Sequence, residues 1–221
     1  STHALYGVGP GAEDADVVLV VDDLTPFTPG VNWPGPDAKV AWIGADPVNS
    51  RYKTMEYQAN LWISATPANV AREVYREAER ILDKADLARI ALRRSRLEDR
   101  KRQLTAEEER LAQEDGRQPQ PTGRWVSYEL GRMLEPDSII VNDGLSNGDF
   151  VRAYARRDRP GTYLRTGSSA GGWGSGAAFG AKLAAAGQDV ILASGDGFFM
   201  FGAPMAALWA ARFHKAPFLS I

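Results

Sequence analysis

Val190-Ile191-Leu192-Ala193-Ser194-Gly195-Asp196-Gly197-Phe198 is the stretch that decides the fold of the second half of the chain. An apolar run that leads into a glycine-rich turn is typical of a buried parallel strand, and a helix is expected next. Glycine on each side of Asp196 lets the backbone turn sharply and approach a ligand closely. Free amides at the helix start and one carboxylate suit a Mg²⁺ ion that bridges to a diphosphate. A plain turn with Asp196 as the helix N-cap fits the local pattern equally well.

Helices and strands alternate around this turn from residue 122 to the end of the sequence. Helices are expected over 124–134, 148–156, 174–186 and 199–214, and strands over 138–142, 163–165, 189–194 and 218–221. This order predicts a parallel sheet with helices on both faces. Ligands of such sheets bind at the carboxyl ends of the strands, so the loops at 142–147, 166–174 and 194–198 should gather there. Five apolar residues at helical spacing are expected in the core: Met200, Phe201, Met205, Leu208 and Trp209.

The first part of the chain predicts a smaller α/β unit. Strands are expected over 17–21, 39–44 and 61–64, followed by a helix from Pro67 to about residue 83. Acids and bases then interleave over 84–121, which favours a solvated helical linker over a basic patch for nucleic acid. The fold class is therefore α/β, with parallel sheets flanked by helices in two units, 1–83 and 122–221, and a charged helical linker over 84–121.

Composition excludes several classes of protein. The formal net charge is −2, which gives no global attraction to nucleic acid or to an anionic membrane, and no apolar run reaches the roughly 18 residues of a membrane span. The absence of cysteine excludes disulfides and thiolate chemistry. A cytoplasmic location is expected, because no signal peptide is evident. The first residue is not Met and the last residues form an apolar run, so we expect a segment of a longer polypeptide.

A second glycine cluster permits an alternative. Gly174, Gly176 and Gly180 match the spacing of a dinucleotide-binding turn, which would make the protein a dinucleotide-dependent oxidoreductase. That turn requires an acid at the end of the following strand. Asp189 instead opens the strand, and Ser194 stands at its end, so the sequence disfavours this alternative.

Several motifs in order resemble a known family. They are Ala15 to Asp22, Pro36 to Val40, the Asp46-Pro47 pair, Gly172 to Lys182, and Gly195-Asp196-Gly197 after its apolar strand. The chain is similar in these to the acetolactate synthase / benzoylformate decarboxylase / 2-hydroxyacyl-CoA lyase superfamily of thiamine-diphosphate (ThDP) enzymes. The resemblance implies that residues 1–83 are the C-terminal part of the central domain. Residues 122–221 would be the diphosphate-binding domain, truncated before the Asn-Asn pair that closes the family's metal motif.

The resemblance also implies site residues. Asp196 would ligate Mg²⁺, and backbone groups of Gly195, Gly197 and Phe198 would contact the diphosphate. A first diphosphate loop would be formed by Asp143, Gly144, Leu145 and Ser146.

A third stretch would meet the aminopyrimidine ring of the cofactor. It comprises Ser169, Ala170 and Gly171. The family usually has a bulky side chain where this chain has Gly171, so another side chain, with Trp173 as the candidate, would have to fill that space.

The function implied by the resemblance is ThDP- and Mg²⁺-dependent cleavage or formation of a C–C bond, a lyase or transferase activity. The small-molecule substrate would be a 2-keto acid, an aldehyde or an acyl-CoA. No catalytic residue is expected in this segment, because the activating glutamate belongs to a pyrimidine-binding domain that the sequence does not contain. A homodimer or homotetramer is expected, without nucleic acid or membrane as partner. A non-catalytic assembly or regulatory protein with the same fold is the other alternative.

Overall fold

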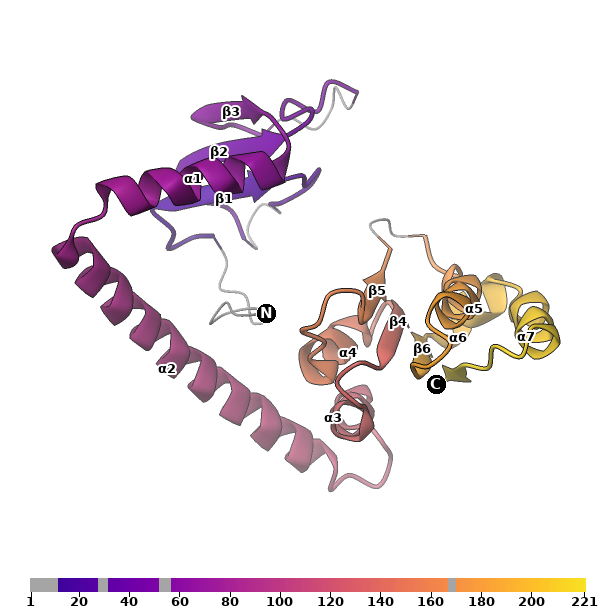
Figure 1. The fold of residues 1–221 in the computed structure, drawn as a ribbon. Coiled ribbons are helices and arrows are strands. Elements are labelled where there is room, and N and C mark those ends of the chain that lie inside the picture. The colour runs from indigo at the N-terminus through magenta and orange to yellow at the C-terminus, as the bar shows by residue number, and fades with distance from the viewer. Residues whose placement is uncertain (1–11, 28–31, 52–56, 167–169) are drawn as a thin grey trace. The chain divides into compact units, whose positions relative to one another are not determined.

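The computed structural model describes residues 12–27, 32–51, 57–166 and 170–221 (Figure 1). It divides into two compact units, and the division falls between Glu98 and Asp99. Both contain a parallel sheet flanked by helices, so the predicted α/β class is confirmed.

The first unit is built on the strands β1 (Val17–Val21), β2 (Lys39–Gly44) and β3 (Leu61–Ser64), which lie in that order and are all parallel. Helix α1 (Pro67–Ile81) follows, with proline in its first turn, where the missing N–H costs no hydrogen bond. Val20, Val40 and Trp42 are buried with Phe27 and form the core of this unit. The three strands coincide with those that the apolar runs predict.

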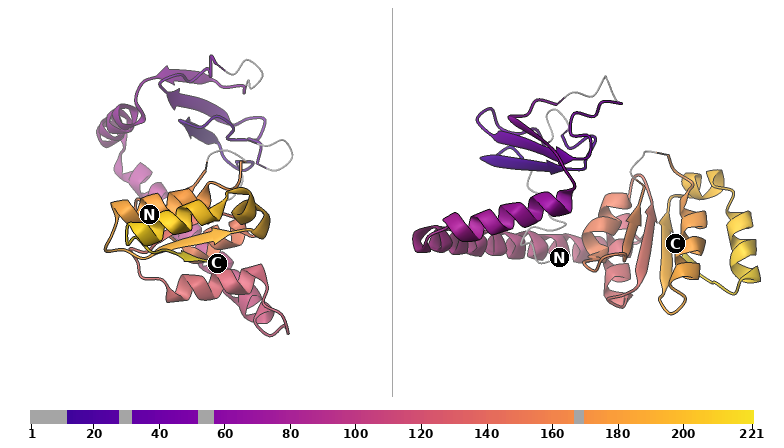
Figure 2. Two further views of the ribbon diagram at one scale, coloured as in Figure 1. Left: turned by 90° about the vertical axis from the view of Figure 1, so that its right-hand side faces the viewer. Right: turned by 45° about the horizontal axis from the view of Figure 1, so that its top comes forward.

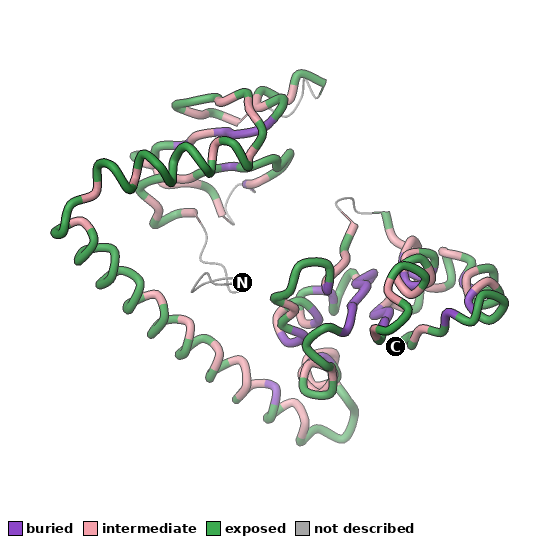
Figure 3. The backbone as a smooth tube through the Cα atoms, in the orientation of Figure 1, coloured by how far each residue is buried: buried purple, intermediate pink, exposed green. Residues whose placement is uncertain are grey.

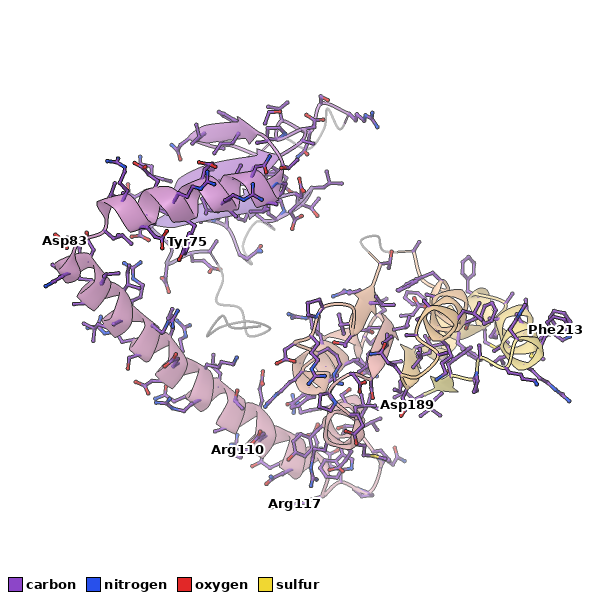
Figure 4. The ribbon with its side chains drawn as sticks, in the orientation of Figure 1. Tyr75, Asp83, Arg110, Arg117, Asp189 and Phe213 are labelled. Atoms are coloured by element: carbon purple, nitrogen blue, oxygen red, sulfur yellow. The ribbon has the colours of Figure 1, made fainter. Side chains whose placement is uncertain are left out.

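The charged segment folds as helix α2 (Lys84–Asp115), in which only Ala112 is buried (Figure 3). Arg110 pairs with Glu107 at 2.6 Å and also with Glu114 (Figure 4). Such exposed pairs stabilise a helix only slightly, because water screens the attraction between the charges. Among the described residues, no helix has both the length and the apolar character that a membrane crossing requires.

The C-terminal part of α2 packs on the second unit, to which it belongs. The hydroxyl of Tyr154 donates a hydrogen bond to the carbonyl oxygen of Glu108 at 2.9 Å. Burial raises the pKa of the Glu108 carboxyl, while the nearby guanidinium of Arg156 acts in the opposite direction. The helix is therefore anchored at this end by backbone bonding as well as by charge.

The second unit contains a four-stranded parallel sheet in the order β5-β4-β6-β7. Its strands are β4 (Ile139–Asp143), β5 (Tyr163–Arg165), β6 (Val190–Ser194) and β7 (Leu219–Ser220). The register of the central pair places Ile139 opposite Val190 and Asp143 opposite Ser194. Both central strands therefore end at the same edge of the sheet.

Helices cover both faces of this sheet (Figure 2). On one face, α5 (Gly174–Ala184) packs with Ala178 against Val141 and Leu192. On the other face, α3 (Gly123–Met133) and α4 (Gly148–Ala155) pack against Ile140 and Ala193. Alternate residues of β4 and β6 thus face opposite layers, as a strand buried on both sides requires.

The prediction of a single helix over 199–214 is wrong. The structure has two helices, α6 (Asp196–Phe201) and α7 (Pro204–Phe213). Pro204 lacks an N–H and disfavours the helical conformation of the residue before it, and Ala203 adopts φ 48°. The chain therefore turns between the two helices.

The prediction that the apolar residues of this region lie in the core is also wrong. Phe201 is 82% exposed and Trp209 is 66% exposed, and Met200 and Met205 are exposed as well. Helix α7 packs on α5 through its other face, on which Ala211 is buried. Helical spacing alone did not distinguish the buried face from a second apolar face.

Leu192 and Leu183 give a matched test of the core. Leu192 lies on β6 and is fully buried against α5, whereas Leu183 lies on α5 and is 49% exposed. Leu192→Ala should lower the free energy of unfolding by about 2–5 kcal/mol, because it leaves a cavity. Leu183→Ala should change it by about 0.5 kcal/mol. Urea unfolding followed by circular dichroism measures both, and equal losses would contradict this core assignment.

Candidate cofactor-binding site

A cavity of about 530 Å³ opens at the carboxyl ends of β4 and β6. It brings together most of the residues that the sequence assigns to diphosphate binding, from two separate loops. These are Gly144, Leu145 and Ser146 after β4, and Gly195, Asp196, Gly197 and Phe198 after β6. The predicted gathering of these two loops is therefore observed at the edge where ligands of parallel sheets bind.

Three helices begin at this cavity. Thr122 caps α3 by accepting a hydrogen bond from the Trp125 amide at 3.1 Å, and both Thr122 and Gly123 line the cavity. Asn147 precedes α4 and Gly195 precedes α6, and they line it too. The first amides of a helix have no acceptor within the helix and carry partial positive charge. The described lining contains no lysine or arginine, so these amides are its source of positive potential.

Asp196 is the first residue of α6, and its side chain is exposed to the cavity. It does not cap the helix, because the N-cap residue is Gly195. Its carboxylate makes no hydrogen bond or ion pair with another described residue. No group of three or more metal-binding side chains lies among the residues described. A cation held here would therefore need oxygen atoms of a ligand, of the backbone or of water beside the one carboxylate.

The glycines beside Asp196 border open space. A Cβ atom built on Gly195 or on Gly197 would meet none of the described atoms within 4 Å. The backbone of this turn is thus accessible to a ligand at both positions. An anionic group with a divalent cation fits the open amides and the unpaired carboxylate together.

The remaining predicted residues lie elsewhere. Asp143 is 4% exposed and is not part of the cavity lining. Ala170 is exposed and Gly171 is partly buried, and neither lines the cavity. Ser169 lies outside the described residues.

Phe198 occupies the space beside Gly171. A Cβ atom on Gly171 would lie 2.2 Å from Cγ of Phe198 and 2.3 Å from the two neighbouring ring carbons. Trp173, the expected candidate, instead packs against the core formed by Val141 and Leu192. Phe198 is the aromatic residue of the described cavity lining, so the missing bulk at Gly171 is matched by a ring from the opposite loop.

Sequence reasoning missed Asn142, which organises the first loop. Its side-chain amide donates to the carbonyl oxygen of Gly148 at 2.8 Å and to the hydroxyl of Tyr163 at 2.7 Å. Its side-chain oxygen accepts from the amide of Gly144 at 3.1 Å. A polar residue at the end of a fully apolar strand was the available signal. The contribution of α3 had no such signal, because its start lies far from the two loops in the sequence.

The three glycines with dinucleotide-turn spacing, Gly174, Gly176 and Gly180, do not line the cavity. Gly174 is the first residue of α5, and a Cβ atom on it would lie 2.6 Å from side-chain carbons of Asp143 and Leu192. Gly176 and Gly180 lie inside α5 and do not line the cavity. Gly174 is therefore explained by close packing of the helix on the sheet.

Residues 144–221 match the family model described as thiamine pyrophosphate enzyme, C-terminal TPP binding domain. The matched segment contains both cavity loops and the Gly195-Asp196-Gly197 turn. A search of curated proteins finds no match. Residues 144–221 of the second unit are therefore similar to the TPP-binding domain of this family, and the predicted resemblance to ThDP-dependent enzymes is confirmed.

Two solved structures share the fold over 93% of this chain. One is a protein from Mycobacterium smegmatis reported as a thiamin diphosphate-dependent enzyme, with 21% identity and a TM-score of 0.60. The other is the thiamine diphosphate-dependent 4-hydroxybenzoylformate decarboxylase of Rhodococcus jostii RHA1, with 19% identity and a TM-score of 0.56. The chain spans 36% of the length of each.

The contact between Gly171 and Phe198 predicts opposite effects for two glycine substitutions. Gly171→Ala should destabilise the protein by about 1–3 kcal/mol, because the new methyl group overlaps the base of the ring. Gly176→Ala should stabilise it by up to about 1 kcal/mol, since it meets no neighbour and improves a helix interior. Thermal unfolding measures both. Addition of Phe198→Ala should restore much of the stability lost in Gly171→Ala, and a failure to do so would contradict the contact.

Proposed function

We propose that the chain binds thiamine diphosphate together with Mg²⁺ in the cavity at the ends of β4 and β6. The carboxylate of Asp196 has no partner among the described residues, and it lies beside three helix starts in a described lining that has no basic side chain. This arrangement is the observation that carries the proposal. A diphosphate brings several negative charges to this lining. Helix amides offset part of that charge, and a divalent cation at Asp196 would offset the rest.

The proposed roles follow from position. Asp196 would ligate Mg²⁺, and the backbone of Gly195, Gly197 and Phe198 would contact the diphosphate from one side. Ser146 and the amides of Gly144 and Leu145 would contact it from the other side. When bound, the cofactor supplies the electron sink for chemistry beside a carbonyl group, while the protein binds and orients it.

The proposed activity is cleavage or formation of a C–C bond in a 2-keto acid or a 2-hydroxyacyl substrate, by the longer protein of which this chain would be a segment. Two findings support this class: the TPP-binding family of residues 144–221, and the likeness to a 4-hydroxybenzoylformate decarboxylase, since decarboxylation breaks a C–C bond. A homo-oligomer would complete the site with the activating glutamate. Product formation from pyruvate, aromatic 2-keto acids and 2-hydroxyacyl-CoAs separates the substrate classes.

Asp196→Ala tests the proposed role of Asp196 as a Mg²⁺ ligand. In calorimetric titration of the full-length protein, wild type should bind thiamine diphosphate with Mg²⁺. Asp196→Ala should bind more than about 100-fold more weakly, because a lost metal ligand costs more than a lost supporting residue does. Asp189→Ala is the matched control, since this exposed acid stands just before β6, at the opposite end of the strand (Figure 4). Unchanged affinity in Asp196→Ala, or tighter binding of NAD or FAD than of thiamine diphosphate, would refute the proposal.

The exposed apolar face of α7 supports the proposed homo-oligomer. Met205, Trp209 and Phe213 recur every fourth residue and are 73%, 66% and 67% exposed, and the rings of Trp209 and Phe213 stack at 5.3 Å. A contiguous apolar face of this kind is typical of an interaction surface.

Trp209→Glu tests this oligomer. It should shift the full-length protein to a smaller species in light scattering, because it buries a charge in the contact, while Leu87→Glu on α2 should not. A wild-type monomer, or an unchanged mass in Trp209→Glu, would contradict the assignment of this face.

A further inference from the structure

Asp143 is a buried acid with no role in the cavity lining. It is the last residue of β4, a central strand that pairs with both β5 and β6, and it is 4% exposed. Burying a carboxyl group is unfavourable unless hydrogen bonds satisfy it. Its partners therefore show what the side chain does.

The side chain of Asp143 binds the glycine turn, residues 171–174, which leads into α5. Oδ2 of Asp143 accepts hydrogen bonds from the amides of Gly172 and Gly174, both at 3.0 Å, and Oδ1 lies 3.3 Å from the amide of Gly172. The N-cap residue of α5 is Trp173, whose side chain cannot accept a hydrogen bond and makes no cap. Asp143 thus replaces the missing cap of α5 from a different element of the fold.

The backbone of the same residue binds the other loop. The carbonyl oxygen of Asp143 accepts from the amide of Gly195 and from the hydroxyl of Ser194, both at 3.4 Å. These contacts extend the β4–β6 ladder, in which Asp143 lies opposite Ser194. One residue therefore contacts both the glycine turn and the residue that precedes Asp196.

The glycine turn also contacts α6. Gly172, at φ 92°, approaches the backbone of Gly202 so closely that a Cβ atom on Gly202 would lie 2.1 Å from the carbonyl oxygen of Gly172. Gly171 lies against the ring of Phe198. Movement of this turn would push on both ends of α6, the helix that begins with Asp196.

We infer that Asp143 is a positioning residue. It holds the glycine turn and the Gly195-Asp196-Gly197 turn together and thereby fixes the position of Asp196. The inference rests on the proposed function for its binding consequence. Its structural part, the coupling of the two turns through one carboxylate, stands without any ligand. In this inference Asp143 supports the cavity loops and does not contact the cofactor, whereas the resemblance of the sequence implies direct contact.

Hydrogen exchange of the ligand-free, full-length protein tests the coupling. In Asp143→Ala, the amides of residues 172–174 and those of 195–202 should both exchange faster, by about tenfold or more, the size expected for a lost hydrogen bond to a charged group. Asp143→Asn keeps one acceptor oxygen and should show a smaller increase in both segments. Ile139→Val is the matched control, because it removes a buried methyl group from the first residue of β4, at the other end of the strand from Asp143 and the two turns. It should leave the two segments unchanged at temperatures where it is fully folded.

Titration with thiamine diphosphate and Mg²⁺ adds the functional readout. Asp143→Ala should weaken binding by about 10–100-fold, as outer residues of a metal site do, with Asp143→Asn in between and Ile139→Val close to wild type. Faster exchange confined to 172–174, or unchanged affinity in Asp143→Ala, would overturn the inference. If Asp143→Ala does not fold, Asp143→Asn carries the same two comparisons. If the wild type fails to bind the cofactor, the proposed function fails, and the exchange of 195–202 then decides the inference alone.

Discussion

The parallel pairing of β4 with β6 is the constraint on which the site depends. Five residue pairs in register, from Ile139 opposite Val190 to Asp143 opposite Ser194, make both strands end at one edge of the sheet. The loops that follow must then leave the sheet side by side. Both strands are buried on two faces by α5 on one side and by α3 and α4 on the other, so a shift of register would expose apolar side chains. Burial in the core therefore fixes the geometry of the cavity.

Electrostatics explains why this cavity suits an anion together with a metal. The described lining has one carboxylate and no basic side chain, and its positive potential comes from the starts of three helices. Helix starts offset only part of a multiply charged anion. A lining of this kind favours a ligand that arrives with its own cation, and we propose that the carboxylate of Asp196, which has no partner among the described residues, holds that cation.

The sequence was informative wherever a backbone pattern decided the outcome. The apolar runs at 17–21 and 190–194 predicted their strands, and the Gly195-Asp196-Gly197 turn predicted the end of β6 and the start of the next helix. The sequence was less informative where a helix has apolar residues on two faces. Trp209 was therefore expected in the core, and it is exposed. Pro204 was a visible signal for the break between α6 and α7 that the helical spacing obscured. The contact of Phe198 with Gly171 joins two loops and has no local signature.

A crystal structure of the full-length protein grown with thiamine diphosphate and Mn²⁺ in place of Mg²⁺ tests the central claim most directly. We expect an anomalous peak for Mn²⁺ at the carboxylate of Asp196, with the diphosphate lying between Ser146 and Gly197. A metal peak away from Asp196, or a diphosphate outside the cavity at the ends of β4 and β6, would contradict it.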